Sequence, residues 1–358
     1  MSRIATTSSA GAILAEPSFL VINVSRIGDT LLATPAIRAI AQARPDARIT
    51  VLGHPKRIEV VQRLGFIARA SGITKNSARW RGRLASRSYD EAIVYGFDEP
   101  LVAYALRVAK RVVAFRQRDD ALNRRLYRVV DVPPFQSEHA IEQLLRLPAA
   151  LDISASSRRL AYEVSVSERE WATARLAANF PANAGPLIGL QVASFPTKAY
   201  RDWPVEHFAE LTQRIVAQWP HAHFLIYGGS GERQRTDWLK RRLGARAALY
   251  AGQLTLRQTA ALMSLTDLYV GVDTGPTHIM SAFDIPLVGL YHCYSPSRLI
   301  GALDHPCFYP VDHPRPHRCE IDVPMAEISV DTVTAAVSRA LNAHSRPRGA
   351  HEVRIRHN

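Results

Sequence analysis

The feature of this sequence that most constrains its fold is a repeated alternation of apolar runs with helical stretches. Phe19–Val24 (FLVINV) is a continuous apolar run of strand length, a loop follows at Ser25–Gly28, and apolar residues then recur at helical spacing. Comparable runs, each separated from the last by a helical stretch, follow at Arg48–Leu52, Glu91–Tyr95 and Arg111–Phe115. This alternation predicts an α/β protein with a doubly wound parallel sheet.

The alternation begins again in the second half of the chain. A charged helical segment, Glu168–Asn179, leads into two proline-containing turns, after which apolar runs return at Leu187–Val192, His223–Tyr227, Leu268–Gly271 and Leu287–Tyr291. Two successive halves of this kind predict two Rossmann-like domains that face a cleft.

The positions of the turns set the expected domain boundaries. We expect domains at 17–165 and 186–342, joined by a linker region at 166–185 and flanked by flexible tails at 1–16 and 343–358. An amphipathic helix at Val330–Leu341 closes the second domain and is a candidate to pack back on the first.

Composition narrows the class of protein. Of the 358 residues, 47% are hydrophobic and 22% charged, as in globular chains, and no apolar run approaches the ~18 residues that a membrane span needs. Three cysteines, an odd number, argue against a disulfide framework and for the reducing cytosol. The formal net charge of +13 fits nucleic acid, an anionic membrane surface or an acidic substrate equally well.

The first candidate site is the loop between the first strand and the first helix, where Gly28 and Asp29 stand. Ligands of open α/β sheets bind at the carboxyl ends of strands, so Asp29 is placed to act as a general base in the cleft. Gly28 permits close approach of another molecule. Asp29 is equally suited to capping the helix. The loop lacks the G-x-G-x-x-G pattern of a dinucleotide site.

The second candidate is the strand–turn–helix junction Leu268–His278 (LYVGVDTGPTH). Free N–H groups at the helix start, together with the hydroxyls of Thr274 and Thr277, form a natural cradle for a diphosphate. Asp273 suits a ribose, a backbone amide or the loop itself better than a phosphate, because like charges repel. The alternative is an ordinary junction with no ligand.

Two further loops supply candidates in the second half. The glycine loop that ends at Glu232 lacks the lysine of a Walker A motif, so it fits a ribose or base site, or a simple tight turn. The segment Ser194–Trp203 offers Lys198 and Arg201, either of which could neutralise a departing diphosphate or be solvated surface.

Together these stretches resemble glycosyltransferase family 9, the ADP-heptose:lipopolysaccharide heptosyltransferases. The resemblance runs from about Phe19 to Leu341 and is carried by Val21–Arg38 (VINVSRIGDTLLATPAIR), Arg201–Leu211 (RDWPVEHFAEL) and Gly252–His278, which ends in VGVDTGPTH. It implies a GT-B fold and inverting sugar transfer with no required metal and no cofactor. The chain contains no Asp-x-Asp sequence, the usual metal-carrying signature of other transferases.

The resemblance also implies roles for individual residues. Asp29 would be the catalytic base, with Ser25, Arg26 and Gly28 on the acceptor side. The second domain would hold the nucleotide sugar through these donor-binding residues: Lys198, Arg201, Gly229, Glu232, Asp273, Thr274, Gly275, Thr277 and His278. Two positions depart from the family pattern. Arg201 stands where the family commonly has lysine, and Arg26 stands where it often has a small residue.

The remaining signals are weaker. Cys307, His313, His317 and Cys319 match no standard zinc spacing and fit either a proline-stiffened loop or a degenerate metal site. Basic residues gather in the first domain, between Val60 and Tyr89 and between Arg107 and Arg128.

The expected function is heptose transfer from ADP-heptose to an anionic glycolipid of the lipopolysaccharide core or a related glycan. The expected location is cytoplasmic, with peripheral contact with an anionic membrane surface. Alternatives are a same-fold transferase with another sugar nucleotide or a protein acceptor and, remotely, a nucleic-acid-binding protein. No nucleic-acid motif supports the last of these.

Overall fold

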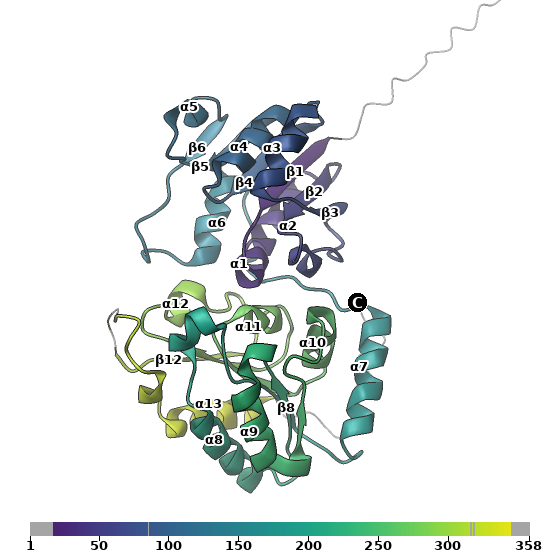
Figure 1. Cartoon of the computed structure of the whole chain (residues 1–358), viewed down its shortest axis with the longest axis vertical. Coiled ribbons are helices and arrows are strands. Elements are labelled where there is room, and N and C mark those ends of the chain that lie inside the picture. Colours follow the sequence, from purple (N-terminus) through teal and green to yellow (C-terminus); the bar gives the residue numbers. More distant parts are fainter. Residues whose placement is uncertain (1–16, 85, 316, 318, 345–358) are drawn as a thin grey trace, which may run out of the picture.

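Two α/β units are stacked along the long axis of the molecule (Figure 1). The computed structural model describes residues 17–84, 86–315, 317 and 319–344. The predicted tail 1–16 and all but the first two residues of the predicted tail 343–358 lie outside this part of the chain. No helix within the described residues is long and apolar enough to cross a bilayer.

The first unit is a parallel sheet of six strands in the order β3-β2-β1-β4-β5-β6. Its strands are β1 (Ser18–Asn23), β2 (Arg48–Gly53), β3 (Arg69–Gly72), β4 (Tyr89–Tyr95), β5 (Ala109–Phe115) and β6 (Arg128–Val130). Its helices are α1 (Ile27–Leu32), α2 (Thr34–Ala43), α3 (Lys75–Leu84), α4 (Glu99–Val108), α5 (Asp120–Asn123) and α6 (Ala140–Ala149).

The second unit repeats this arrangement with the order β12-β11-β10-β7-β8-β9. Its strands are β7 (Leu187–Gln191), β8 (His223–Tyr227), β9 (Ala247–Leu249), β10 (Leu268–Val272), β11 (Leu287–Tyr291) and β12 (Phe308–Asp312). The helices packed on it are α7 (Val166–Asn179), α8 (Val205–Gln218), α9 (Arg233–Leu243), α10 (Leu256–Met263), α11 (Gly275–Met280), α12 (Ser297–Ile300) and α13 (Val330–Ala343). The predicted doubly wound α/β class is therefore confirmed.

The strand order fixes where a ligand can bind. In each sheet the order reverses beside the first strand, between β1 and β4 in one unit and between β7 and β10 in the other. A crevice opens at the carboxyl ends of the strands at such a switch point. The loops that follow β1, β7 and β10 therefore converge between the units. These loops and the loop after β8 carry the predicted site residues.

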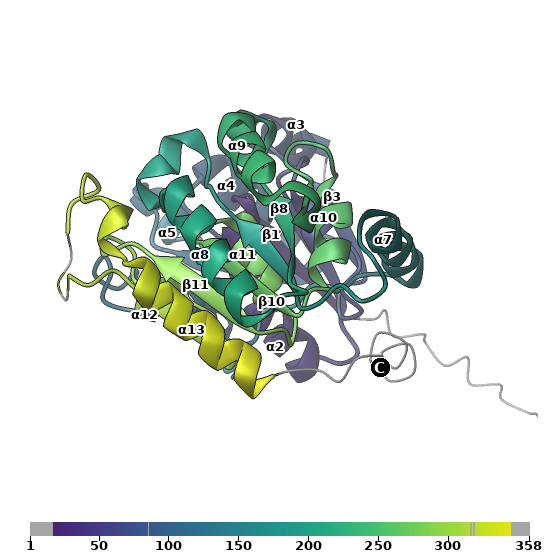
Figure 2. The same ribbon diagram turned by 90° about the horizontal axis from the view of Figure 1, so that it is seen from below.

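Packing contacts, rather than the local sequence, decide to which unit the helices α7 and α13 belong. The helix α7 falls in the predicted linker, yet it packs against α10, and Arg257 of α10 forms a bidentate ion pair with Glu168 at 2.8 and 2.6 Å. Among the described residues, the final helix α13 packs mainly on the second unit. Its apolar face, including Val333 and Val337, is buried against β10, β11 and α8 of the second unit (Figure 2).

Four strands escaped the sequence pattern: β3, β6, β9 and β12. All four lie at a sheet edge. The strands β3, β6 and β12 carry polar or proline residues and β9 has only three residues, so none shows the continuous apolar run of a central strand. The other eight strands were predicted to within two residues at each end.

Candidate active site

The two units meet where the first turns of α1 and α11 pack against each other. A Cβ built on Gly28 would lie 2.6 Å from Cδ2 of His278, and one built on Gly275 would lie 3.1 Å from Cβ of Ile27. Both distances are shorter than an ordinary carbon contact, so only glycine lets these backbones approach so closely. The two loops singled out in the sequence are thus brought face to face (Figure 1).

Asp29 lies in the first turn of α1, at this junction. Its side chain is exposed and, within the described part of the chain, makes no hydrogen bond or ion pair. It does not cap the helix, because the N-cap position is Arg26 and no side chain accepts a capping hydrogen bond there. Burial acts to lower the pKa of the Arg201 guanidinium in the second unit, but the negative charge of Asp273 and, to a smaller extent, that of Asp29 raise it. A carboxylate of this kind is free to accept a proton from a substrate.

Across the junction lies a buried cluster of charged side chains. Asp273 is 2% exposed; one of its oxygens is 2.6 Å from Nη1 of Arg201 and the other is 3.3 Å from Nε2 of His278. Burial by itself would raise the pKa of Asp273, but the hydrogen bond with His278 and the positive charge of Arg201 hold it below its ordinary value. The carboxylate is therefore charged, and it orients the Arg201 guanidinium and the His278 ring.

Arg201 is held from a second side by Tyr200. Its Nε donates to the Tyr200 hydroxyl at 3.1 Å, and its guanidinium lies 5.3 Å from the centre of that ring. Lys198 is also near, with its ammonium group 5.6 Å from the Tyr200 ring and its charge acting on Asp273. Sequence reasoning singled out both cations and missed Tyr200, although the residue stands between them in the same motif.

The loop that carries these cations is anchored to the second unit. Asp202 accepts hydrogen bonds from the backbone N–H and the hydroxyl of Ser194 at 2.6 and 2.7 Å, and its other oxygen pairs with Arg235 at 2.6 Å. Trp203 is 1% exposed and donates its indole N–H to the carbonyl of Ile328 at 2.8 Å. Because the loop is already fixed, little conformational entropy of Lys198 and Arg201 is lost when a ligand binds.

Of the groups predicted to bind a diphosphate at the start of α11, the backbone N–H groups remain available and the Thr277 hydroxyl does not. Thr274 is the N-cap, and its side chain makes no capping bond, so the first N–H groups of α11 are free of side-chain partners. The Thr277 hydroxyl, in contrast, donates to the carbonyl of Val272 at 2.6 Å and contacts the Tyr269 hydroxyl at 3.0 Å. That hydroxyl is committed to the interior, and Thr277 offers only its backbone N–H.

The glycine loop after β8 presents a carboxylate. Glu232 is 8% exposed and, among the described residues, its carboxylate has no hydrogen-bond partner. A Cβ on Gly229 would lie 2.7 Å from Oε2 of Glu232, so the side chain folds over the glycine backbone. An acceptor held close to a loop without a partner of its own is suited to a ribose hydroxyl or an amino group.

On the other side of the junction, the loop after β1 carries positive charge. Arg26 is exposed, and Arg57 donates to the carbonyl of Ser25 at 3.1 Å. The Ser25 hydroxyl is 3.0 Å from that of Thr30. Arg57 was missed in the sequence, because it lies in a separate loop after β2 and only the sheet register brings it here.

The cysteines overturn one expectation. Cys293 and Cys319 form a disulfide, with their Cα atoms 5.5 Å apart, although the odd cysteine count argued against such bonds. They meet because the chain after β12 folds over the end of β11, which residues 26 apart in sequence could not reveal. The set Cys307, His313, His317 and Cys319 does not gather; within the described residues, Cys319 instead lies with His292 and Cys293.

Comparisons with known proteins identify the family of this chain. The model of "Glycosyltransferase family 9 (heptosyltransferase)" matches residues 74–305. The chain is 22% identical over 305 residues to the lipopolysaccharide core heptosyltransferase OpsX of Haemophilus influenzae, covering 79% of this chain and 81% of that protein. It is 26% identical over 317 residues to lipopolysaccharide heptosyltransferase 1 of Pseudomonas aeruginosa, covering 80% and 84%.

Solved structures give the same result for the fold. A glycosyltransferase family 9 protein of Veillonella parvula superposes with a TM-score of 0.79 at 17% identity, over 93% of this chain and 99% of that one. The E. coli ADP-heptose lps heptosyltransferase II superposes with a TM-score of 0.75 at 18% identity, over 92% and 100%. The fold is therefore GT-B, as the resemblance implied, and the chain is a glycosyltransferase that belongs to glycosyltransferase family 9.

Proposed function

We propose that this protein transfers a heptose from ADP-heptose to a sugar of the lipopolysaccharide core or a related envelope glycan, with inversion and without a metal ion. The observation that carries the proposal is an exposed Asp29 carboxylate, without a partner in the part of the chain that the structure describes, which lies directly across the unit junction from the Arg201–Asp273–His278 cluster. The names of the relatives, which include lipopolysaccharide and ADP-heptose, support this choice of acceptor and donor.

In the proposed reaction, Asp29 removes the proton of the acceptor hydroxyl as its oxygen attacks the anomeric carbon of the donor. Attack from the side opposite the leaving diphosphate inverts the configuration at that carbon. The general base contributes through its position, since it must lie within hydrogen-bond reach of the hydroxyl.

The second unit stabilises the leaving ADP. Arg201 and Lys198 would supply positive charge, and the N–H groups of Gly275 and Thr277 at the start of α11, which no side chain caps, would donate to the diphosphate. Asp273 does not touch the phosphates in this scheme; it fixes Arg201 and His278 from behind. Glu232, whose carboxylate lies over Gly229, accepts hydrogen bonds from the nucleoside in this scheme.

The basic first unit is the proposed acceptor side. Arg26 and Arg57 lie at the junction, on the same loop edge as Ser25 and Asp29, and would bind an anionic group of the acceptor. The net charge of +13 further supports peripheral contact with the anionic cytoplasmic leaflet. We place the protein in the cytoplasm on this reasoning.

The proposal is tested by replacing Asp29→Asn and measuring ADP release from ADP-heptose with a heptose-deficient lipopolysaccharide acceptor. Transfer should fall by about 10²-fold or more, as expected for loss of a general base, while ADP affinity measured by calorimetry stays within twofold. Asp46→Asn is the matched control, since Asp46 is another exposed aspartate, located in the turn before β2. If Asp29→Asn turns over at the wild-type rate, Asp29 is not the general base. If the protein transfers sugar from a GDP- or UDP-sugar in preference to ADP-heptose, the proposed donor is wrong.

A further inference from the structure

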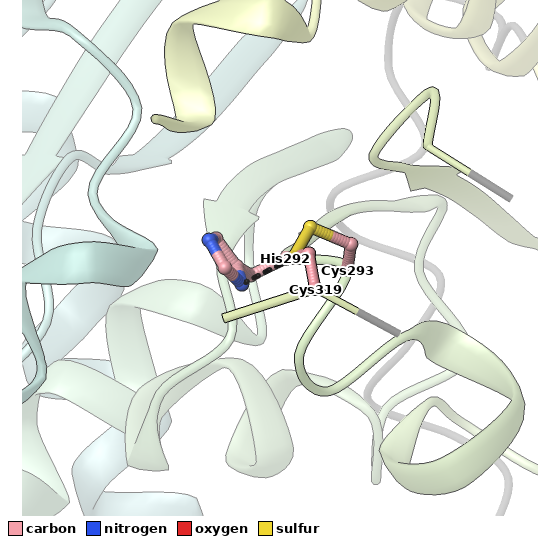
Figure 3. Close-up of side chains that lie close together, drawn as sticks. All are labelled: His292, Cys293 and Cys319. Carbon is pink, nitrogen blue, oxygen red and sulfur yellow. Dashed lines mark hydrogen bonds between the residues drawn. A yellow bond between two sulfur atoms is a disulfide. The ribbon is translucent and has the colours of Figure 1, made fainter. Parts of the chain in front are cut away.

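A cluster of three potential metal ligands lies at the end of β11, outside the residues used in the proposed transfer. His292 and Cys293 follow this strand directly, and Cys319 reaches them from the loop after β12 (Figure 3). One ligand atom from each of the three residues lies within 4.8 Å of the others. We propose that, once the Cys293–Cys319 disulfide is reduced, these residues bind a thiophilic divalent cation of the zinc type.

The distances fit such an ion. Tetrahedral zinc with Zn–S bonds of about 2.3 Å and Zn–N bonds of about 2.1 Å separates a sulfur from a nitrogen ligand by about 3.6 Å. Sγ of Cys319 and Nδ1 of His292 are 3.9 Å apart. The two sulfurs, now bonded, separate by side-chain rotation, because both belong to the ends of loops rather than to strands.

The histidine is held in the orientation that metal-binding histidines adopt. Its Nε2 bonds the carbonyl of Val323 at 2.7 Å, which places the proton on Nε2 and leaves the Nδ1 lone pair on the side of Cys319. The Tyr294 N–H donates to the same Nδ1 at 3.0 Å, and a bound ion replaces this hydrogen bond. A neutral imidazole with its remote nitrogen fixed by a backbone carbonyl is a ready ligand.

Charge and access also fit. His292 is fully buried and Cys293 is 4% exposed, so two thiolates here require a compensating cation. Cys319 is half-buried and lines an open cavity of about 690 Å³ together with His317, Glu320 and Asp322. This cavity gives a reductant and an ion a way in, and it supplies a water or a further side chain as the fourth ligand.

The site would clamp two loops beside the donor cluster. The His292 ring packs edge-on against Tyr200 at 5.2 Å, and the Tyr200 hydroxyl accepts from Arg201. On the other side of Cys293, the carbonyl of Tyr294 accepts a hydrogen bond from Gln136 of the first unit. A metal ion would therefore take over the role of the disulfide in fixing this loop. The inference does not depend on the identity of the sugar donor.

The test uses the full-length protein, stripped of metal by a chelator and reduced by a water-soluble phosphine. The phosphine takes its oxygen from water and is oxidised, while the disulfide gains two electrons and two protons to give two thiols. Cobalt(II) and then zinc(II) are titrated after the reductant is removed under nitrogen; each thiol releases its proton on binding. The readouts are the thiolate-to-cobalt charge-transfer absorption and competition with a chromophoric chelator.

One ion per chain should bind to the reduced wild type and none to the oxidised protein. Cys293→Ser and Cys319→Ser should weaken binding by about 100-fold or more, as for loss of a ligand, and His292→Gln by about 10-fold. Cys307→Ser, which alters the third cysteine, should bind as the wild type does. Circular dichroism melts of every variant show whether it is folded.

The proposed site is refuted if the reduced wild type binds cobalt or zinc no more tightly than the Cys293→Ser/Cys319→Ser double variant. It is also refuted if that double variant binds a full equivalent of metal. Should a single cysteine variant fail to fold, protection of Cys293 and Cys319 from alkylation by added zinc in the wild type decides the question. Protection supports the site, and equal alkylation with and without zinc refutes it.

Discussion

Gly28→Ala tests whether the close packing of α1 on α11 is needed for transfer. The added Cβ would lie 2.6 Å from Cδ2 of His278, whereas ordinary contacts begin at 3.4 Å, so one side must move by about 0.8 Å. His278 cannot yield freely because it is 7% exposed and bonded to Asp273 at 3.3 Å. Overpacking of this size costs about 1–3 kcal/mol.

The two units can relieve this strain by moving apart. The substitution should therefore destabilise the arrangement in which α1 and α11 are in contact, and leave the free energy of unfolding of each unit nearly unchanged. If transfer requires closure, kcat/KM should drop by about 5- to 150-fold, the equivalent of 1–3 kcal/mol. The melting temperature should change little. The assay is ADP release at subsaturating donor and acceptor, combined with a thermal melt of each variant.

Gly65→Ala is the matched control, since its Cβ meets nothing nearer than a Glu163 oxygen at 4.0 Å. A His278→Ala background should reduce the penalty of Gly28→Ala, because the clashing ring is gone, and the double-mutant cycle measures that coupling. Equal kcat/KM for Gly28→Ala and Gly65→Ala would refute the reasoning, and so would a penalty that persists in full without the His278 ring.

Three further outcomes are expected. Arg201→Met removes one of the positive charges that lower the pKa of Asp273, so Asp273 should take up a proton at a higher pH than in the wild type. The free energy of unfolding of the variant should therefore begin to fall at a higher pH as the solution is acidified, and urea melts from pH 3 to 7 measure this. Arg257 helps lower the Glu168 pKa to about 2, which adds stability above the unfolded pKa that is lost as pH falls toward 2. Glu168→Gln should therefore cost about 1 kcal/mol at pH 7 and nothing near pH 2, and a uniform cost across pH would contradict the ion pair. Glu232→Gln should raise KM for the donor by about 10-fold and leave kcat within threefold if Glu232 binds the nucleoside only in the ground state, and steady-state kinetics separate the two.

The cysteine pair illustrates how distant segments define a site that no local pattern reveals. In the sequence, Cys319 was grouped with Cys307, His313 and His317, because all four lie within one short stretch. In the fold, His313 bonds the Pro324 carbonyl and approaches Glu327, while Cys319 joins two residues of the preceding strand end. Parallel pairing of β11 with β12 brings the ends of both strands together, and sequence spacing carries no trace of this register.

The sequence by itself determined the class of fold and the loops that form the site. A strand that is buried on both faces is a nearly continuous apolar run, so β1 and β10 can be recognised from the local sequence. A turn from a strand into a helix needs glycine and small polar residues, so the loops that carry Asp29 and Asp273 can be recognised in the same way. The edge strands were not legible, because β3, β6 and β12 carry polar or proline residues and β9 has only three residues.

Only the tertiary structure decided how each of these side chains is used. It turned the Thr277 hydroxyl inward to Val272, brought Arg57 to the Ser25 loop and left Asp29 without a partner among the described residues. It also placed α13 on the second unit and set Gly28 against His278. These outcomes depend on which elements touch across the two sheets, and contacts between distant residues are set by packing of the whole chain rather than by the composition of any one segment.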